Sequence, residues 1–200
     1  MPDRATTARR KDVALAGHSG DTAGVRVGLT DRAALVRATA LGALARLGQL
    51  DGEFLAAAFS DRDPVVRRRA AELAPNVGPS MLAQLSSLLG DGDHRVVEAA
   101  CFALGELGEK AALGVAALSR VAVDHPDPLC RETAVAALGA IGDPEGLAAI
   151  LMATADKPAV RRRAVLALAP FEGEAVDAAL ARALTDRDWQ VRQAAEDLTT

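Results

Sequence analysis

Small apolar residues recur at helical intervals along almost the whole chain, and each series follows an acidic turn. A two-residue pair, most often Val-Arg, opens each series. Counted from the first residue of that pair, Ala stands at position +4, and positions +7 and +8 are mostly Ala-Leu. These positions share one face of an α-helix, so the pattern predicts an amphipathic helix with a buried apolar stripe. The pairs are Val36-Arg37, Val66-Arg67, Val96-Val97, Cys130-Arg131, Val160-Arg161 and Val191-Arg192.

The residues between these helices predict a second, shorter helix in each unit. Asp63 can cap the helix that follows it, and Pro64 suits the first turn of that helix. Glycine at the far end, as at Gly108 and Gly142, predicts a left-handed residue that closes the last turn. A shorter apolar-periodic stretch then follows, so each unit is predicted to be a helical hairpin. The shorter stretches are residues 21–29, 52–59, 80–89, 111–121, 144–153 and 174–184.

A hairpin repeated every 30 to 34 residues predicts an α-solenoid, because such a unit must stack on its neighbours to bury its apolar face. We expect a single all-α, right-handed solenoid of about six helix-turn-helix units. Residues 1–20 are expected to form an N-terminal segment with a capping helix. Glu196 occupies the +5 position that is apolar in the earlier units, which predicts a polar end to the stack. The units span residues 21–48, 49–76, 77–108, 109–142, 143–171 and 172–200.

The composition agrees with closely packed helices. Half of the residues are hydrophobic but only 2% are aromatic, so the core must consist of small aliphatic side chains. The net charge of -4 argues against extensive binding of phosphates. No apolar run is long enough to cross a bilayer, and the polar start predicts a cytoplasmic protein without membrane insertion. Cys101 and Cys130 have no metal-site or disulfide spacing and are expected to be reduced, packed thiols.

The series from Asp127-Pro128 through Cys130-Arg131 to Ala137-Leu138-Gly139 resembles the short HEAT-like repeats of bilin-lyase-type and related bacterial proteins. The resemblance covers residues 21–198. It implies a scaffold or adaptor, since most proteins of this kind bind other proteins and few are enzymes. We therefore expect a non-catalytic module without a cofactor or metal, which binds a protein or peptide on its concave surface. No feature of the sequence specifies an oligomeric state.

The recurring arginine at position +1 is expected to be structural. A guanidinium offers a fixed fork of donors, which suits carboxylates and carbonyls in adjacent turns. Ligand binding by this row is the alternative. Val97 interrupts the row, and local loosening of the stack there is a hypothesis. The predicted ladder consists of Arg37, Arg67, Arg131, Arg161 and Arg192.

Outward-facing positions of the longer helices supply the candidate partner site. Position +6 holds Phe102, Ala136 and Leu166, which would form an apolar strip across successive helices. An exposed apolar strip rimmed by mixed charge is typical of a protein interface. In the alternative, Phe102 and Leu166 pack into grooves between helices and the charges only solvate the surface. The charged residues of the candidate site are Glu98, Glu132, Arg68, Arg69, Arg162 and Arg163.

Two other functions are weaker alternatives. The basic clusters at residues 67–69 and 161–163 suggest nucleic-acid binding, as in HEAT-like DNA glycosylases, but Glu98 and Glu132 lie between them and aromatic stacking platforms are missing. A HEAT-like lyase or regulatory enzyme subunit is the other alternative. A HEAT-like iron hydroxylase would need His-Glu motifs, and Glu follows none of the three histidines, His18, His94 and His125.

Overall fold

The computed structural model describes residues 3–199, which form helices joined by short turns. After α1 (Arg4–Ser19), the helices pair into six hairpins, and the predicted all-α solenoid is confirmed. The hairpins are α2 (Thr22–Gly28) with α3 (Ala34–Arg46), α4 (Gly52–Phe59) with α5 (Pro64–Leu73), α6 (Leu82–Leu88) with α7 (His94–Leu107), α8 (Val115–Asp124) with α9 (Pro128–Ile141), α10 (Leu147–Ala153) with α11 (Pro158–Ala167), and α12 (Glu174–Ala183) with α13 (Trp189–Thr199).

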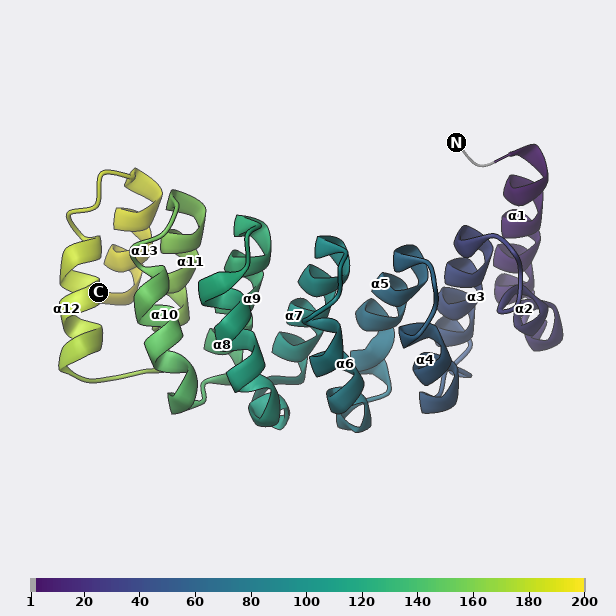
Figure 1. The fold of residues 1–200 in the computed structure, drawn as a ribbon, viewed down its shortest axis with the longest axis horizontal. Coiled ribbons are helices and arrows are strands. Elements are labelled where there is room, and N and C mark those ends of the chain that lie inside the picture. Colours follow the sequence, from purple (N-terminus) through teal and green to yellow (C-terminus); the bar gives the residue numbers. More distant parts are fainter. Residues whose placement is uncertain (1–2, 200) are drawn as a thin grey trace.

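The hairpins stand side by side in one elongated row, with α1 and α2 at one end and α12 and α13 at the other (Figure 1). The second helices of successive hairpins, from α3 to α13, pack directly on one another, and α1 packs on α3. The first helices contact each other less extensively. Since the closer spacing is on the second-helix side, the row bows and the second helices line its hollow face. We call this face the inner face.

The helix ends follow the predicted turn chemistry with one exception. The Asp63 carboxylate accepts a hydrogen bond from the Val65 N–H at 3.0 Å, and Pro64 lies in the first turn of α5. Gly142 is left-handed, with φ of 71°, and its N–H donates to the Leu138 carbonyl. The prediction of a left-handed residue is wrong at Gly108. Its φ is 56° but its ψ is -140°, because the chain continues at once into a 3-10 helix over Gly108–Gly114.

One apolar core runs along the row, with smaller clusters at its two ends. The central cluster extends from Leu41 in α3 to Ala179 in α12, so each hairpin shares its core with its neighbours. The apolar residues at position +5 are buried, whereas Glu196 is exposed. Cys101 and Cys130 are free thiols in this core. Within residues 3–199, every helix is too short or too polar to traverse a bilayer.

Candidate functional site

The recurring arginines lie in the joints between hairpins. Each of four predicted members uses Nε and Nη2 to bind both oxygens of an aspartate 24 or 25 residues further along the chain. The Nη1 group donates to a carbonyl in the turn before the arginine's own helix. Such bidentate bonds fix both position and orientation. The pairs are Arg37–Asp61 (2.6 Å), Arg67–Asp91 (2.6 Å), Arg131–Asp156 (2.6 Å) and Arg161–Asp186 (2.7 Å).

The two ends of this ladder differ from its middle. Arg192 donates a hydrogen bond from Nη1 to the Asp186 carbonyl at 2.7 Å. At the other end, Arg9 of α1 binds Asp31 at 2.7 Å, a contact that the sequence pattern did not reveal. Since α1 also packs on α3, it extends the row of second helices by one member. The ladder arginines point into joints, so their guanidinium groups are engaged by the protein itself.

The aspartates of the ladder organise their own turns as well. In most of them Oδ1 also accepts the N–H of the residue two positions on, as Asp91 does from Asp93 at 2.9 Å. The arginine hydrogen bond holds the pKa of Asp91 below its ordinary value against the effect of burial. At Asp61 burial is the largest influence and raises the pKa, but the bonds from Arg37 and Asp63 outweigh it. Hydrogen bonds from arginine likewise lower the pKa values of Asp31, Asp156 and Asp186.

At the joint between α7 and α9, both residues of the arginine–aspartate pair are replaced. Val97 stands in place of the arginine in α7, and His125 stands in place of the aspartate before α9. Val97 is 1% exposed, and His125 Nδ1 accepts the Asp127 N–H at 3.1 Å, as an aspartate oxygen does in the other turns. Val97 is buried and His125 bonds its own turn, so we expect no loosening here. The α7–α9 joint therefore packs without the arginine–aspartate pair of the other joints.

We expect the ladder aspartates to make the protein less stable in acid. Each ladder aspartate has a lower pKa in the folded chain than in the unfolded one, so its contribution is complete above about pH 4 and is lost as the pH falls through the folded value. Urea unfolding should give similar free energies at about pH 7 and pH 5 and lower ones toward pH 3. As the pH is lowered, the backbone amides of α5 and α11 should lose protection from hydrogen exchange before those of α7 and α9. Equal loss in all four helices would contradict this.

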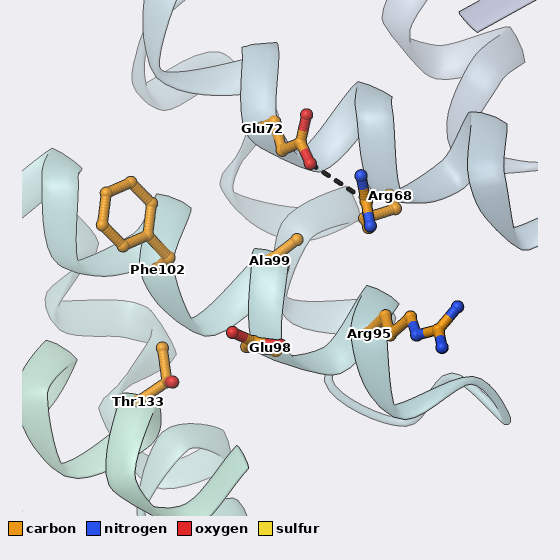
Figure 2. A pocket seen from close by; sticks show the side chains of 7 residues that line it. All are labelled: Arg68, Glu72, Arg95, Glu98, Ala99, Phe102 and Thr133. Carbon is orange, nitrogen blue, oxygen red and sulfur yellow. Dashed lines mark ion pairs between the residues drawn. The ribbon is translucent and has the colours of Figure 1, made fainter. Parts of the chain in front are cut away.

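An open groove lies on the inner face where α5, α7 and α9 meet (Figure 2). Its volume is about 390 Å³, and Phe102 of α7 is 59% exposed beside it. The Phe102 ring projects away from its own helix, and Arg95 lies at the opposite end of α7's exposed face (Figure 2). We call this the Phe102 groove. It is lined by Arg68, Glu72, Arg95, Glu98, Ala99, Phe102 and Thr133.

The structure brings only some of the candidate partner residues together. Arg68, Glu98 and Phe102 line one groove, whereas Glu132 and Arg163 lie in the next gap along the row and approach to 3.7 Å. Ala136 and Arg162 are partly exposed outside the Phe102 groove. Leu166 is half-buried against the C-terminal core cluster, so it is less available than Phe102. Arg69 binds Glu72 at 2.9 Å at the edge of the groove.

Sequence reasoning missed Arg95 and Thr133 as parts of this groove. Arg95 stands at position -1 of its unit, three residues before Glu98 and seven before Phe102. That spacing keeps the three side chains on one helical face. The spacing of Arg95 from Glu98 and Phe102 is therefore the signal that places it on this face. Thr133 stands at position +3 of the following unit and reaches the groove through the packing of α9 on α7.

The cysteines and acidic turns do not form a reactive cluster in the described chain. Burial raises the pKa of Cys101, and it raises that of Cys130 to about 11. Such thiols stay protonated near neutral pH and are poor nucleophiles. Across residues 3–199, no group of three or more His, Cys, Asp or Glu side chains converges as metal ligands would. His94 and His125, which precede successive helices, are not joined in such a group.

Comparisons with solved structures agree with this fold. YIBA of E. coli is 15% identical, with a TM-score of 0.66 over 98% of this chain and 74% of that one. A designed armadillo repeat protein in complex with the peptide (KR)4 is 15% identical, with a TM-score of 0.61 over 96% and 97%. Human deoxyhypusine hydroxylase in complex with glycerol is 20% identical, with a TM-score of 0.51 over 96% and 77%. At these identities the similarity concerns the fold alone.

The family comparison is more specific. HEAT repeats match residues 52–115, 82–158 and 115–198 in three overlapping segments. Among curated proteins, no relative with significant sequence similarity was found. The matched segments cover most of the chain and include the five hairpins from α4 to α13. The chain belongs to the HEAT repeat family.

Proposed function

We propose that this protein is a cytoplasmic scaffold or adaptor that binds a segment of another protein on its inner face and carries out no chemistry. The observation that carries the proposal is the Phe102 groove, where an aromatic ring is 59% exposed among charged side chains. Burial of an exposed ring stabilises a complex, and surrounding polar groups give the contact its orientation. A row of second helices repeats similar positions along its length, so a partner can lie across several hairpins.

The fold supports this proposal in general terms. Repeats of this class stack into extended surfaces, and such surfaces commonly bind proteins or peptides. The designed armadillo repeat protein, which has a similar fold, is in complex with a peptide. The ladder arginines are held within the joints, so they serve the stack, and the outward residues of α5, α7, α9 and α11 remain for a partner. The proposed contact residues are Phe102, Ala136, Leu166, Glu98, Glu132, Arg68, Arg69, Arg162 and Arg163.

Phe102→Ser is the direct test of this proposal. Because the ring is largely exposed, we expect the free energy of unfolding to change by less than about 1 kcal/mol. Binding of a partner should weaken at least about tenfold, since an anchor residue is removed. Proteins retained by the wild type from a lysate of the native cells would be identified, purified and remeasured by calorimetry against both forms. Leu166→Ser is a poorer probe, because Leu166 also packs on the C-terminal cluster.

Two variants provide matched controls. Leu113 is 91% exposed and Trp189 is 65% exposed, and neither lines the Phe102 groove. Leu113→Ser and Trp189→Ser therefore remove exposed apolar surface of similar character elsewhere. We expect both controls to retain the partner. Equal binding by wild type and Phe102→Ser, or a loss of several kcal/mol of stability in Phe102→Ser, would contradict the proposal.

A further inference from the structure

The part of the inner face formed by α5, α7, α9 and α11 has a small surplus of positive charge, although the chain as a whole has a net charge of -4. Outward positions of α5, α7, α9 and α11 hold five arginines and four glutamates. A local surplus of this kind attracts groups of opposite sign and raises their rate of association. The arginines are Arg68, Arg69, Arg95, Arg162 and Arg163, and the glutamates are Glu72, Glu98, Glu106 and Glu132.

The glutamates do not use up the hydrogen-bonding capacity of these arginines. Glu72 is shared, since it binds Arg68 at 3.0 Å and Arg69 at 2.9 Å. Arg163 is 3.7 Å from Glu132, which is long for an ion pair, and its Nε is buried without a hydrogen-bond partner. A buried donor without an acceptor raises the free energy of the folded protein, and an acceptor from a partner would remove this cost.

Arg95 is an exposed cation at one end of the Phe102 groove. Within residues 3–199 it takes part in no ion pair, and its side chain extends away from the glutamates (Figure 2). Arg95 and Phe102 stand seven residues apart on one face of α7, about two helical turns, or roughly 10 Å along the axis. A short peptide segment spans this distance easily. The groove therefore presents an aromatic surface at one end and a guanidinium group at the other.

We infer that the partner segment is acidic, with an apolar side chain that packs on Phe102 and carboxylates that bind Arg95 and Arg68. This inference rests on the proposed function and specifies its partner chemistry. Carboxylates match the fork of donors on arginine, and the apolar anchor supplies the buried area. Glu98, between the two ends, disfavours a segment that is negative at every position. An isolated acidic residue near an anchor fits the groove better than a continuous run of charge.

A nucleic acid fits this surface less well than an acidic peptide. Its phosphates recur at every nucleotide, and four glutamates lie among the arginines that would have to meet them. Bases also need aromatic platforms in series, and Phe102 is the aromatic residue of this groove. A peptide, in contrast, can carry acidic residues at the positions that face arginines and uncharged residues at the positions that face glutamates.

Selection from a displayed library of random short peptides tests the inference without knowledge of the partner. We expect the wild-type protein to enrich peptides that have net negative charge and one or two aromatic or aliphatic residues. Their affinity, measured by fluorescence anisotropy, should fall at least about tenfold in Arg95→Glu and should weaken with added salt. Arg120→Glu makes the same charge change on α8, at an exposed arginine outside the Phe102 groove, and should leave the affinity unchanged.

Other outcomes would overturn the inference in distinguishable ways. Enrichment of basic or neutral peptides whose binding needs Phe102 would reject the acidic partner and leave the proposed function standing. Peptides that bind equally to the wild type and to both Phe102→Ser and Arg95→Glu would reject the groove as the site. The absence of any enrichment would reject recognition of a short acidic segment. Tighter binding of a single-stranded oligonucleotide than of the selected peptides would favour a nucleic acid instead.

Discussion

We expect Arg67→Val to lower the free energy of unfolding by about 2 kcal/mol, which urea unfolding at neutral pH would measure. The substitution leaves Asp91 without its arginine in a joint where the aspartate side chain is only 8% exposed. It also removes the bond from Arg67 Nη1 to the Asp61 carbonyl at 2.8 Å. A buried, unpaired carboxylate costs more than the ion pair contributes, so the loss exceeds that of a surface pair.

The chain itself supplies the control for this experiment. At the α7–α9 joint, Val97 and His125 replace arginine and aspartate together, and the joint packs closely. Arg67→Val/Asp91→His copies that pair at the α5–α7 joint. The double variant should recover at least half of the stability that Arg67→Val loses, because the unpaired aspartate carboxylate is removed and the histidine can accept the Asp93 N–H. A double variant that is less stable than Arg67→Val would refute this account of the joint.

We expect Gly139→Ala to destabilise the protein by about 2 to 3 kcal/mol, although alanine favours a helix more than glycine does. A Cβ at position 139 would lie 2.7 Å from the Ala167 Cα and 3.1 Å from its carbonyl oxygen. Both atoms belong to the backbone of α11, so α9 and α11 would have to move apart. In a repeat array such a shift weakens one joint and the two hairpins beside it.

Gly42→Ala is the matched control for that change. Gly42 also lies inside a second helix, but a Cβ there would meet only the guanidinium end of Arg69, at 2.7 Å from Nη2. A flexible side chain can turn aside, so the gain in helix propensity should leave Gly42→Ala neutral or up to about 1 kcal/mol more stable. Thermal and urea unfolding of both variants would be compared. Similar effects at the two positions would show that backbone spacing does not govern Gly139.

The fold could be predicted from local patterns because each unit repeats the same short-range chemistry. The shorter stretch predicted at residues 52–59 is α4, and the cap at Asp63 forms as expected. The predicted turn conformation was wrong where the chain does not turn directly into the next helix. At Gly108 the chain enters a 3-10 helix, and the turn before α8 thus has a different backbone from the one after Ile141.

The candidate site was predictable only in part. The exposed face of α7 was recognised at Glu98 and Phe102, because positions on one helix have fixed spacing. Leu166 stands at the same repeat position as Phe102, yet the two side chains differ in exposure. The C-terminal cluster of α12 and α13 covers part of Leu166, and no comparable packing covers Phe102. Equivalent sequence positions therefore need not give equivalent surfaces.

The sequence by itself determined the hairpins, their order and the arginine and aspartate positions, since helical periodicity and capping act over a few residues. Only the tertiary structure decided which aspartate each arginine binds, that Arg9 extends the ladder, and that Arg95 and Phe102 share an open groove. These features depend on how closely successive second helices approach. That distance is set by side chains on two helices at once, as at Gly139 and Ala167, and no single segment encodes it.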